Sequence, residues 1–356
     1  MTEPLAPGAT IGILGGGQLG RMLSVAASRL GFRTCIFEPA GDCPASHVSN
    51  YHYKAPYDDA GALRQFGESV DVITYEFENI PTEALDLLEA LAPIRPNRRA
   101  LAVSQDRLVE KAFLSEQGLK TAGFAAVDDA VDMAEAMAEI GAPGILKTRR
   151  FGYDGKGQAQ VLEASFSDEA LAEMQGAPAI YEAFVDFSHE VSVIGARGLD
   201  GAVACFDPGE NLHQGGILRT TTVPARLTAA QATDAVLIAA AILNKLDYVG
   251  VLGVELFVTP GGLIVNEIAP RVHNSGHWTQ SGCQIDQFEQ HIRAIAGWPL
   301  GDGSRYADVV MENLIGDDMD RVPELATDGC SIHLYGKGEA RPGRKMGHVN
   351  RVMREQ

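Results

Sequence analysis

The chain has 356 residues, of which 46% are hydrophobic and 21% charged, and its formal net charge is −18. This length is enough for two or three domains with a substantial core. The negative charge argues against a nucleic-acid-binding protein, because contacts to phosphates need a basic surface. The sequence contains no apolar run long enough to span a membrane and no signal peptide. Its five scattered cysteines, with no CxxC pair, predict a reducing, cytoplasmic location and argue against a zinc site.

Strand and helix patterns alternate over the first hundred residues. Strands are predicted at Thr10–Leu14, Thr34–Glu38 and within Val70–Ile80, and a helix between Gly15 and Gly31. Such alternation predicts a doubly wound parallel sheet. The two prolines of Ala92–Asn97 mark the end of this unit.

The rest of the chain has an α+β pattern. Helices are predicted at Ser104–Gly118, Asp128–Ile140 and Ala229–Leu246, and strands at Gly144–Thr148, Gln158–Leu162, Ala179–Phe184, Val309–Leu314 and Cys330–Tyr335. In the first of these helices, we expect one apolar stripe made of Leu108, Val109, Ala112 and Phe113.

A hairpin with two acidic residues is the most informative feature of the sequence. The β-rich runs Val251–Val258 and Leu263–Ile268 flank the turn Thr259–Gly262, so Glu255 and Glu267 lie opposite each other or one position out of register. Directly opposed side chains are about 5 Å apart and like charges there repel, which predicts a cation between them. A few oxygen ligands with room for phosphate oxygens suit Mg²⁺ on a nucleotide.

The alternative for this hairpin is a solvent-facing edge whose two acids merely align. Four polar residues that adjoin the second strand favour the metal–nucleotide site: Asn266, Arg271, His273 and Asn274.

The motif Gly15-x-Gly17-x-x-Gly20 follows a strand and opens a helix, with Glu38 at the end of the second strand. Glycines let the backbone approach a ligand, and a helix N-terminus attracts anions. The motif fits the dinucleotide fingerprint. Three interpretations remain open at this point: NAD binding, a phosphorylated substrate, or a purely structural turn.

Two further segments carry possible nucleotide chemistry. A strand delivers Lys147 to the glycine-rich loop Gly152–Gln158, which can cradle phosphates or simply form a hairpin turn at Asp154-Gly155. The apolar strand Ile180–Val185, which carries Glu182 and is followed by Glu190, can bind adenine and ribose or serve as an ordinary core strand.

The order of these features resembles the ATP-grasp superfamily, and longer motifs narrow the resemblance to N5-carboxyaminoimidazole ribonucleotide synthetases. These motifs are Gly15–Met22, Tyr75–Pro81, Gln105–Arg107, Phe151–Gln158, Asn266–Thr279, Leu334–Lys337 and Gly343–Asn350. They extend from about residue 11 to about residue 351, nearly the whole chain.

The resemblance implies a fold and a reaction. We expect an N-terminal Rossmann-like pre-ATP-grasp domain at 1–103, an ATP-grasp domain at 104–300 with a lid at about 115–185, and a small C-terminal β-rich domain at 301–356. The implied reaction uses ATP to activate bicarbonate as carboxyphosphate, which carboxylates the amine of aminoimidazole ribonucleotide in purine synthesis. The family also implies two Mg²⁺ ions, a homodimer and a functional hand-off to a carboxy-mutase.

The resemblance also assigns roles to individual residues. Those expected to bind ATP are Arg107, Lys147, Gly152, Tyr153, Asp154, Gly155, Lys156, Gly157, Gln158, Glu182, Ala183, Phe184, Val185, Glu190, His213, Asn266 and Glu267. Glu255 and Glu267 are expected to carry the metal. The catalytic set around bicarbonate is expected to be Arg271, His273, Asn274 and Asp154. Those expected to bind the ribonucleotide are Gln18, Leu19, Glu76, Tyr153, Asp154, Arg271, Lys337 and Arg344, the last on a loop at Gly336–Gly347.

Two other functions remain open at the level of sequence. An NAD-dependent dehydrogenase would explain the N-terminal glycines and Glu38 but not the acidic hairpin. A catalytically silent ATP-grasp-like binding protein is disfavoured by the intact set Glu255, Asn266 and Glu267.

Overall fold

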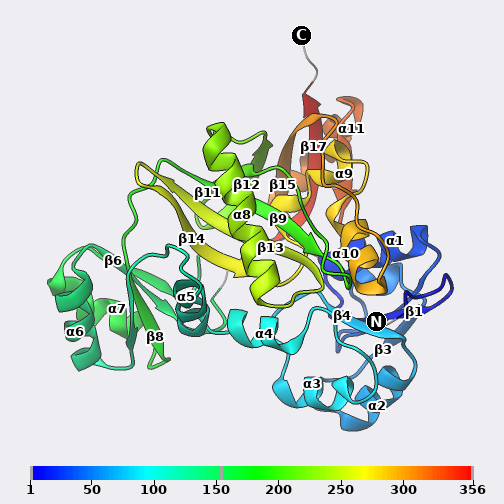
Figure 1. Ribbon diagram of the computed structural model, residues 1–356, viewed down its shortest axis with the longest axis horizontal. Helices are drawn as coiled ribbons and strands as arrows, with labels where there is room; N and C mark the ends of the chain where they lie inside the picture. The colour runs from blue at the N-terminus through cyan, green and yellow to red at the C-terminus, as the bar shows by residue number, and fades with distance from the viewer. Residues whose placement is uncertain (1–2, 153–154, 354–356) are drawn as a thin grey trace.

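The computed structural model describes residues 3–152 and 155–353, and within these residues the strands form three sheets. Figure 1 shows the small sheet of the middle segment at one side and the N-terminal unit at the other. The largest sheet lies between and above them, with helix α8 across its face. Among the described residues, no helix combines the length and hydrophobicity that crossing a membrane requires.

The N-terminal sheet is parallel, as predicted, with the order β3-β2-β1-β4. Its strands are β1 (Thr10–Leu14), β2 (Arg33–Phe37), β3 (Tyr51–Tyr53) and β4 (Val72–Tyr75). The helices of this unit are α1 (Gln18–Arg29), α2 (Ala60–Glu68), α3 (Thr82–Glu89) and α4 (Arg98–Ser104), with a 3-10 turn η1 (Pro44–His47). The sequence did not suggest β3, which is only three residues long and half exposed.

The middle segment forms its own antiparallel sheet in the order β5-β8-β6-β7. Its strands are β5 (Phe124–Val127), β6 (Gly144–Thr148), β7 (Gln158–Val161) and β8 (Ala179–Ala183). Helix α6 (Ala130–Ile140), the 3-10 turn η2 (Ala164–Phe166) and helix α7 (Ser167–Glu173) complete the unit. A separate core, which includes Met133, Leu146 and Tyr181, holds it together. We call this unit the lid sheet.

The largest sheet has the order β14-β13-β9-β11-β12-β15-β17-β16, with β10 paired to β9. Its strands are β9 (His189–Arg197), β10 (Val203–Cys205), β11 (Gly209–Gln214), β12 (Ile217–Val223), β13 (Gly250–Thr259), β14 (Gly262–Ala269), β15 (Asp308–Ile315), β16 (Ser331–Leu334) and β17 (Lys345–Met353). Around it lie α8 (Ala229–Lys245), η3 (Asn274–Gly276), α9 (Thr279–Gly282), α10 (Gln287–Ala296), η4 (Gly316–Arg321) and α11 (Val322–Thr327). The C-terminal strands therefore extend the central sheet through the β12–β15 pair instead of forming a sheet of their own.

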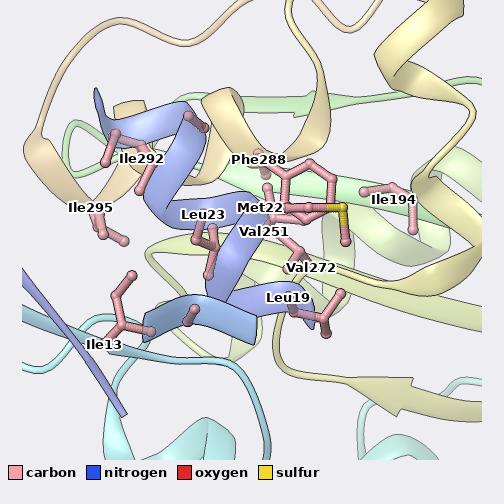
Figure 2. Close-up of a cluster of buried hydrophobic side chains, with 14 of the residues drawn as sticks. Ile13, Leu19, Met22, Leu23, Ile194, Val251, Val272, Phe288, Ile292 and Ile295 are labelled. Atoms are coloured by element: carbon pink, nitrogen blue, oxygen red, sulfur yellow. The ribbon is translucent and has the colours of Figure 1, made fainter. Parts of the chain in front are cut away.

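The N-terminal unit is joined to the central sheet by a continuous apolar core. In Figure 2, Leu19, Met22 and Leu23 of α1 lie among Ile194, Val251 and side chains of α10. Leu23, Val251 and Ile292 of this cluster are fully buried. This packing fixes the glycine turn before α1 next to the central sheet, where a ligand between the two units would lie.

Two local predictions were wrong. Residues 104–118 form the end of α4 and a separate helix α5 (Arg107–Glu116), and Val109 of the predicted apolar stripe is 42% exposed. The buried face of α5 instead includes Glu110 and Lys111. The predicted loop Gly336–Gly347 ends early, because β17 begins at Lys345.

Candidate active site

A cavity of about 760 Å³ lies where the N-terminal unit, the lid sheet and the central sheet meet. Its walls contain most of the side chains that the sequence predicted for the site. The predicted residues that line the cavity are Gln18, Leu19, Glu76, Arg107, Lys147, Gly152, Gly155, Lys156, Gln158, Phe184, Glu190, His213, Glu255, Asn266, Glu267, Arg271, His273 and Asn274. Residues separated by more than 250 positions in sequence thus face one space.

The two acids of the hairpin lie directly opposite each other, Glu255 on β13 and Glu267 on β14. Burial and then the charge of Glu267 raise the pKa of Glu255 to about 7. Burial opposes ionisation of Glu267 too, but the charge and hydrogen bond of Arg107 lower its pKa to about 2. Two facing carboxylates in a cavity, with a cation already beside one, form an oxygen donor set that fits Mg²⁺.

Arg107 is the first residue of α5, and its placement follows from the helix cap. Asp106 caps α5 through the Leu108 N–H and also pairs with Arg149, whose Nη2 is 2.8 Å from Asp106 Oδ2. Arg107 Nη1 lies 2.8 Å from Glu267 Oε2. The Asp106–Arg149 pair therefore ties the end of β6 in the lid sheet to helix α5, whose Arg107 pairs with Glu267.

Lys147 extends from β6 to Glu182 on the neighbouring strand β8, with Nζ 3.0 Å from Oε2. A second ammonium group, Lys111 Nζ, is 3.5 Å from the same oxygen. Glu182 and Lys111 are only 3% and 2% exposed. Burial opposes the charge on Glu182, but Lys147 and then Lys111 outweigh it and lower the pKa of this carboxyl.

The glycine-rich loop is shaped by backbone conformations that favour glycine. Gly155 and Gly157 have φ angles of 77° and 69°. A Cβ at Gly157 would approach Thr148 Oγ1 within 2.5 Å, so a larger residue would displace the loop from β6. Tyr153 and Asp154, which the sequence predicted for both ATP and the ribonucleotide, lie outside the described residues.

Glu190 and His213 adjoin the hairpin acids from strands β9 and β11. His213 Nδ1 lies 2.9 Å from Glu190 Oε2. Ligand atoms of Glu190, His213 and Glu255 all lie within 4.8 Å of one another, so this corner of the cavity attracts cations and hydroxyl groups. Burial lowers the pKa of His213, but the close contact with Glu190 and the charges of Glu190 and Glu255 together outweigh it, so the net shift of the pKa is upward.

The N-terminal glycine loop is occupied by the protein's own carboxylates. Glu76 accepts hydrogen bonds from the N–H groups of Gly17 and Gly20, the latter at 2.7 Å. Glu38 accepts one from Gly16 at 3.1 Å. A dinucleotide pyrophosphate needs these same donors at the start of the helix. The occupied donors therefore argue against the dehydrogenase alternative.

Arg271 follows the acidic hairpin and is held by a fork of two bonds to Glu78, at 2.8 and 3.3 Å. His273 Nε2 lies 3.4 Å from Glu255 Oε1. Burial and then the charge of Arg271 lower the pKa of His273 to about 3, which makes this imidazole neutral at physiological pH. Together they present one fixed cation and one neutral hydrogen-bonding ring to the cavity.

Six predicted residues in the described part of the chain do not line this cavity: Gly157, Glu182, Ala183, Val185, Lys337 and Arg344. Sequence reasoning also missed residues that do line it, notably Glu78, Glu110 and Lys345. Glu78 lies within the motif Tyr75–Pro81, and Lys345 lies in a basic segment of an otherwise acidic chain, so both carried a signal. Glu110 carried none.

Three protein-family models match successive parts of the chain. Residues 8–105 match the ribonucleotide synthetase preATP-grasp domain, residues 112–288 the ATP-grasp domain, and residues 309–356 the phosphoribosylaminoimidazole carboxylase C-terminal domain. An N5-carboxyaminoimidazole ribonucleotide synthase of Brucella melitensis is 54% identical, over 98% of this chain and 97% of that protein. The chain belongs to the N5-carboxyaminoimidazole ribonucleotide synthase family. Like its relatives, it is an ATP-dependent ligase of purine synthesis.

Solved structures agree with this membership. The ADP complex of N5-carboxyaminoimidazole synthetase from Staphylococcus aureus is 37% identical, with a TM-score of 0.94 over 99% of this chain and 95% of that one. The Aspergillus clavatus enzyme with ADP and 5-aminoimidazole ribonucleotide is 31% identical, with a TM-score of 0.91 over 98% of this chain and 94% of that one. This chain therefore shares the fold of these enzymes. It also shares the general requirement of ATP-grasp enzymes for a divalent metal.

Proposed function

We propose that the cavity between the three sheets carries out the family's reaction, the ATP-dependent carboxylation of aminoimidazole ribonucleotide with bicarbonate. The observation that carries this proposal is the convergence of Lys147, the pair Glu255 and Glu267, and Arg271 on one cavity that also reaches Glu76. Bicarbonate is a poor electrophile, so the γ-phosphate of ATP is transferred to it to give carboxyphosphate and ADP. The ribonucleotide amine then captures the carboxyl group and releases phosphate.

The protein's contribution is positioning and charge stabilisation, as in other phosphoryl transfers. Lys147, Arg107 and the glycine-rich loop supply cations and N–H donors for the ATP phosphates. Glu190 and His213 lie where a ribose hydroxyl can bond to both, with the end of β8 and the residues that follow it, Glu182–Val185, beside the adenine. Glu255 and Glu267 would hold two Mg²⁺ ions, which would supply neutralising charge for the ATP phosphates.

Arg271, His273 and Asn274 bind bicarbonate and the carboxylated intermediate. Arg271 is suited to this because its guanidinium is oriented by Glu78 before any ligand arrives. Asp154 belongs to the same catalytic set, and it binds the ribonucleotide together with Tyr153, Gln18, Leu19 and Glu76. The lid sheet excludes water, which would hydrolyse carboxyphosphate.

The reaction is tested by following phosphate release from MgATP with labelled bicarbonate, with and without aminoimidazole ribonucleotide. We expect ADP formation to depend on the ribonucleotide and the label to enter the product as an acid-labile carbamate. If label from formate enters the product and label from bicarbonate does not, the chain is a transformylase and the proposal is wrong.

Lys337 and Arg344 are proposed to bind the phosphate of the ribonucleotide. Their loop lies against the N-terminal unit. A Cβ added at Gly336 would be 3.2 Å from His47 Nδ1 and 3.5 Å from Arg21 Nη1. We expect Lys337→Ala and Arg344→Ala each to raise the KM for the ribonucleotide about tenfold, which corresponds to about 1.4 kcal/mol. The KM for ATP should change little.

Steady-state kinetics, with each substrate varied in turn, measure the KM for the ribonucleotide and the KM for ATP. Arg341→Ala is the matched control. Arg341 lies on the same loop, its side chain is 67% exposed, and it pairs with Glu339. Equal increases in both constants would show that the loop organises the whole cavity and does not specifically bind the ribonucleotide.

The remaining proposals concern organisation beyond the site. We propose domain limits at 1–103, 104–300 and 301–356, with the lid at about 115–185. We also propose a cytoplasmic homodimer that hands its unstable product to a carboxy-mutase, and sedimentation of the chain with and without that enzyme tests both associations.

A further inference from the structure

The strand that carries Glu267 is interrupted by a β-bulge at the metal site. From the turn, the pairing of β13 with β14 runs regularly to Leu256 opposite Val265, and then shifts so that Glu255 faces Glu267. Asn266 is the extra residue and has no partner on β13. Without the shift, Glu255 would face Asn266 and Glu267 would face Val254.

The bulge decides which face of the sheet Glu267 occupies. Side chains alternate along a strand, and a slip of one residue reverses the face. Val265 and Ile268 belong to the apolar core beneath α8, although Ile268 also borders the cavity. The consecutive residues Asn266 and Glu267 both line the cavity and lie outside that core. In a regular strand Glu267 would point into that core beside Val254, which is fully buried.

Two consecutive ionisable residues of α5 bind the backbone on either side of Glu267. Burial and then the charge of Glu267 raise the pKa of Glu110 to about 8. Lys111 Nζ donates to the Asn266 carbonyl at 2.7 Å, and Glu110 Oε1 accepts from the Ile268 N–H. Glu110 and Lys111 are 3% and 2% exposed. Buried charged groups are costly unless they make hydrogen bonds, and here each bonds to a backbone group at the bulge.

These bonds also complete the outer edge of the central sheet. β14 is an edge strand, and Val265 N–H already donates to the Lys120 carbonyl at 2.8 Å on that side. Beyond Val265, Lys111 and Glu110 provide the next hydrogen-bond partners along this edge. Without them, backbone groups of the edge strand would be unpaired. The bulge is therefore held from outside the hairpin by a helix that packs against it.

We infer that Glu110 and Lys111 are positioning residues of the metal site, which hold the bulge that directs Glu267 into the cavity. Neither residue needs to touch the metal or ATP for this role. The inference rests on the proposed metal role of Glu255 and Glu267. It predicts that the hydrogen-bond acceptor at position 110 and the reach of that side chain set the metal affinity, and that a carboxyl group is not required.

The test compares Glu110→Gln, which keeps an acceptor oxygen at the same reach, with Glu110→Asp, which keeps a carboxyl group but is one methylene shorter. Binding of Mn²⁺ to the protein in the presence of ADP is measured by electron paramagnetic resonance. We expect the aspartate variant to bind Mn²⁺ at least about tenfold more weakly and the glutamine variant to stay within about threefold of the parent. Hydrogen exchange of residues 263–272 in the metal-free protein should accelerate in the aspartate variant only.

Parent-like binding by both variants, or weaker binding by the glutamine variant alone, would overturn the inference. Glu267→Gln is measured in parallel and should lose Mn²⁺ binding. If that control binds Mn²⁺ normally, the proposed metal role fails. If it loses binding while Glu110→Asp does not, the metal role stands and only the positioning role is wrong.

Discussion

Replacing Glu267 with glutamine is expected to lower turnover at saturating MgATP at least about 100-fold, the scale of losing a main electrostatic contribution to transition-state stabilisation. Glutamine keeps the size and one acceptor oxygen of the side chain but removes the charge that binds the metal. The effect is expected to be large because Glu267 is the more strongly ionised of the two hairpin acids, held so by Arg107.

The fold of this variant should survive. Removing one of two facing carboxylates relieves repulsion in the metal-free protein, and the amide oxygen can still accept from Arg107. We expect the melting temperature to change by no more than about 3 °C, or roughly 1 kcal/mol for a chain of this size. Turnover and thermal unfolding are measured beside Glu210→Gln, whose carboxylate pairs with the exposed Arg226. Near-normal turnover at high magnesium would remove Glu267 from the metal site.

The hairpin illustrates how far the sequence alone can lead. Turn residues between two β-rich runs predicted its strands closely, and the lengths around the turn brought Glu255 near Glu267. They did not distinguish the regular register from the shifted one, because the bulge is held by Glu110 and Lys111 from a distant helix. A bulge stabilised by tertiary contacts leaves no local pattern in its own strand.

Buried charge and long-range pairing account for the other misses. Periodicity follows apolar residues, so the predicted apolar stripe included Val109, which is exposed, and did not include Lys111, which is buried. Similarly, β15 was found as a strand from its own residues. Its pairing with β12, about 90 positions earlier, depends on contacts that no local window contains.

Glu182→Gln is expected to have the largest effect on stability. Glu182 is shared by Lys147 and Lys111, and all three groups are largely buried. Removing the carboxylate leaves two buried ammonium groups without the counter-charge that they share. Breaking a buried ion pair in this way typically costs about 3–5 kcal/mol, and we expect at least about 3 kcal/mol at pH 7.

The pH dependence of this loss distinguishes charge from packing. Burial lowers the pKa of Lys111 even in the parent, and without Glu182 it should fall further. The unfolded chain then binds more protons than the folded one between that lowered pKa and about 10.4, the ordinary value for lysine, so the variant should gain stability as pH rises through this window. Unfolding by urea at pH 7 and pH 9.5 measures this, with the exposed Glu169→Gln of the lid sheet as control. If the variant loses the same free energy of unfolding at both pH values, lost packing destabilises it, and the two uncompensated ammonium groups do not.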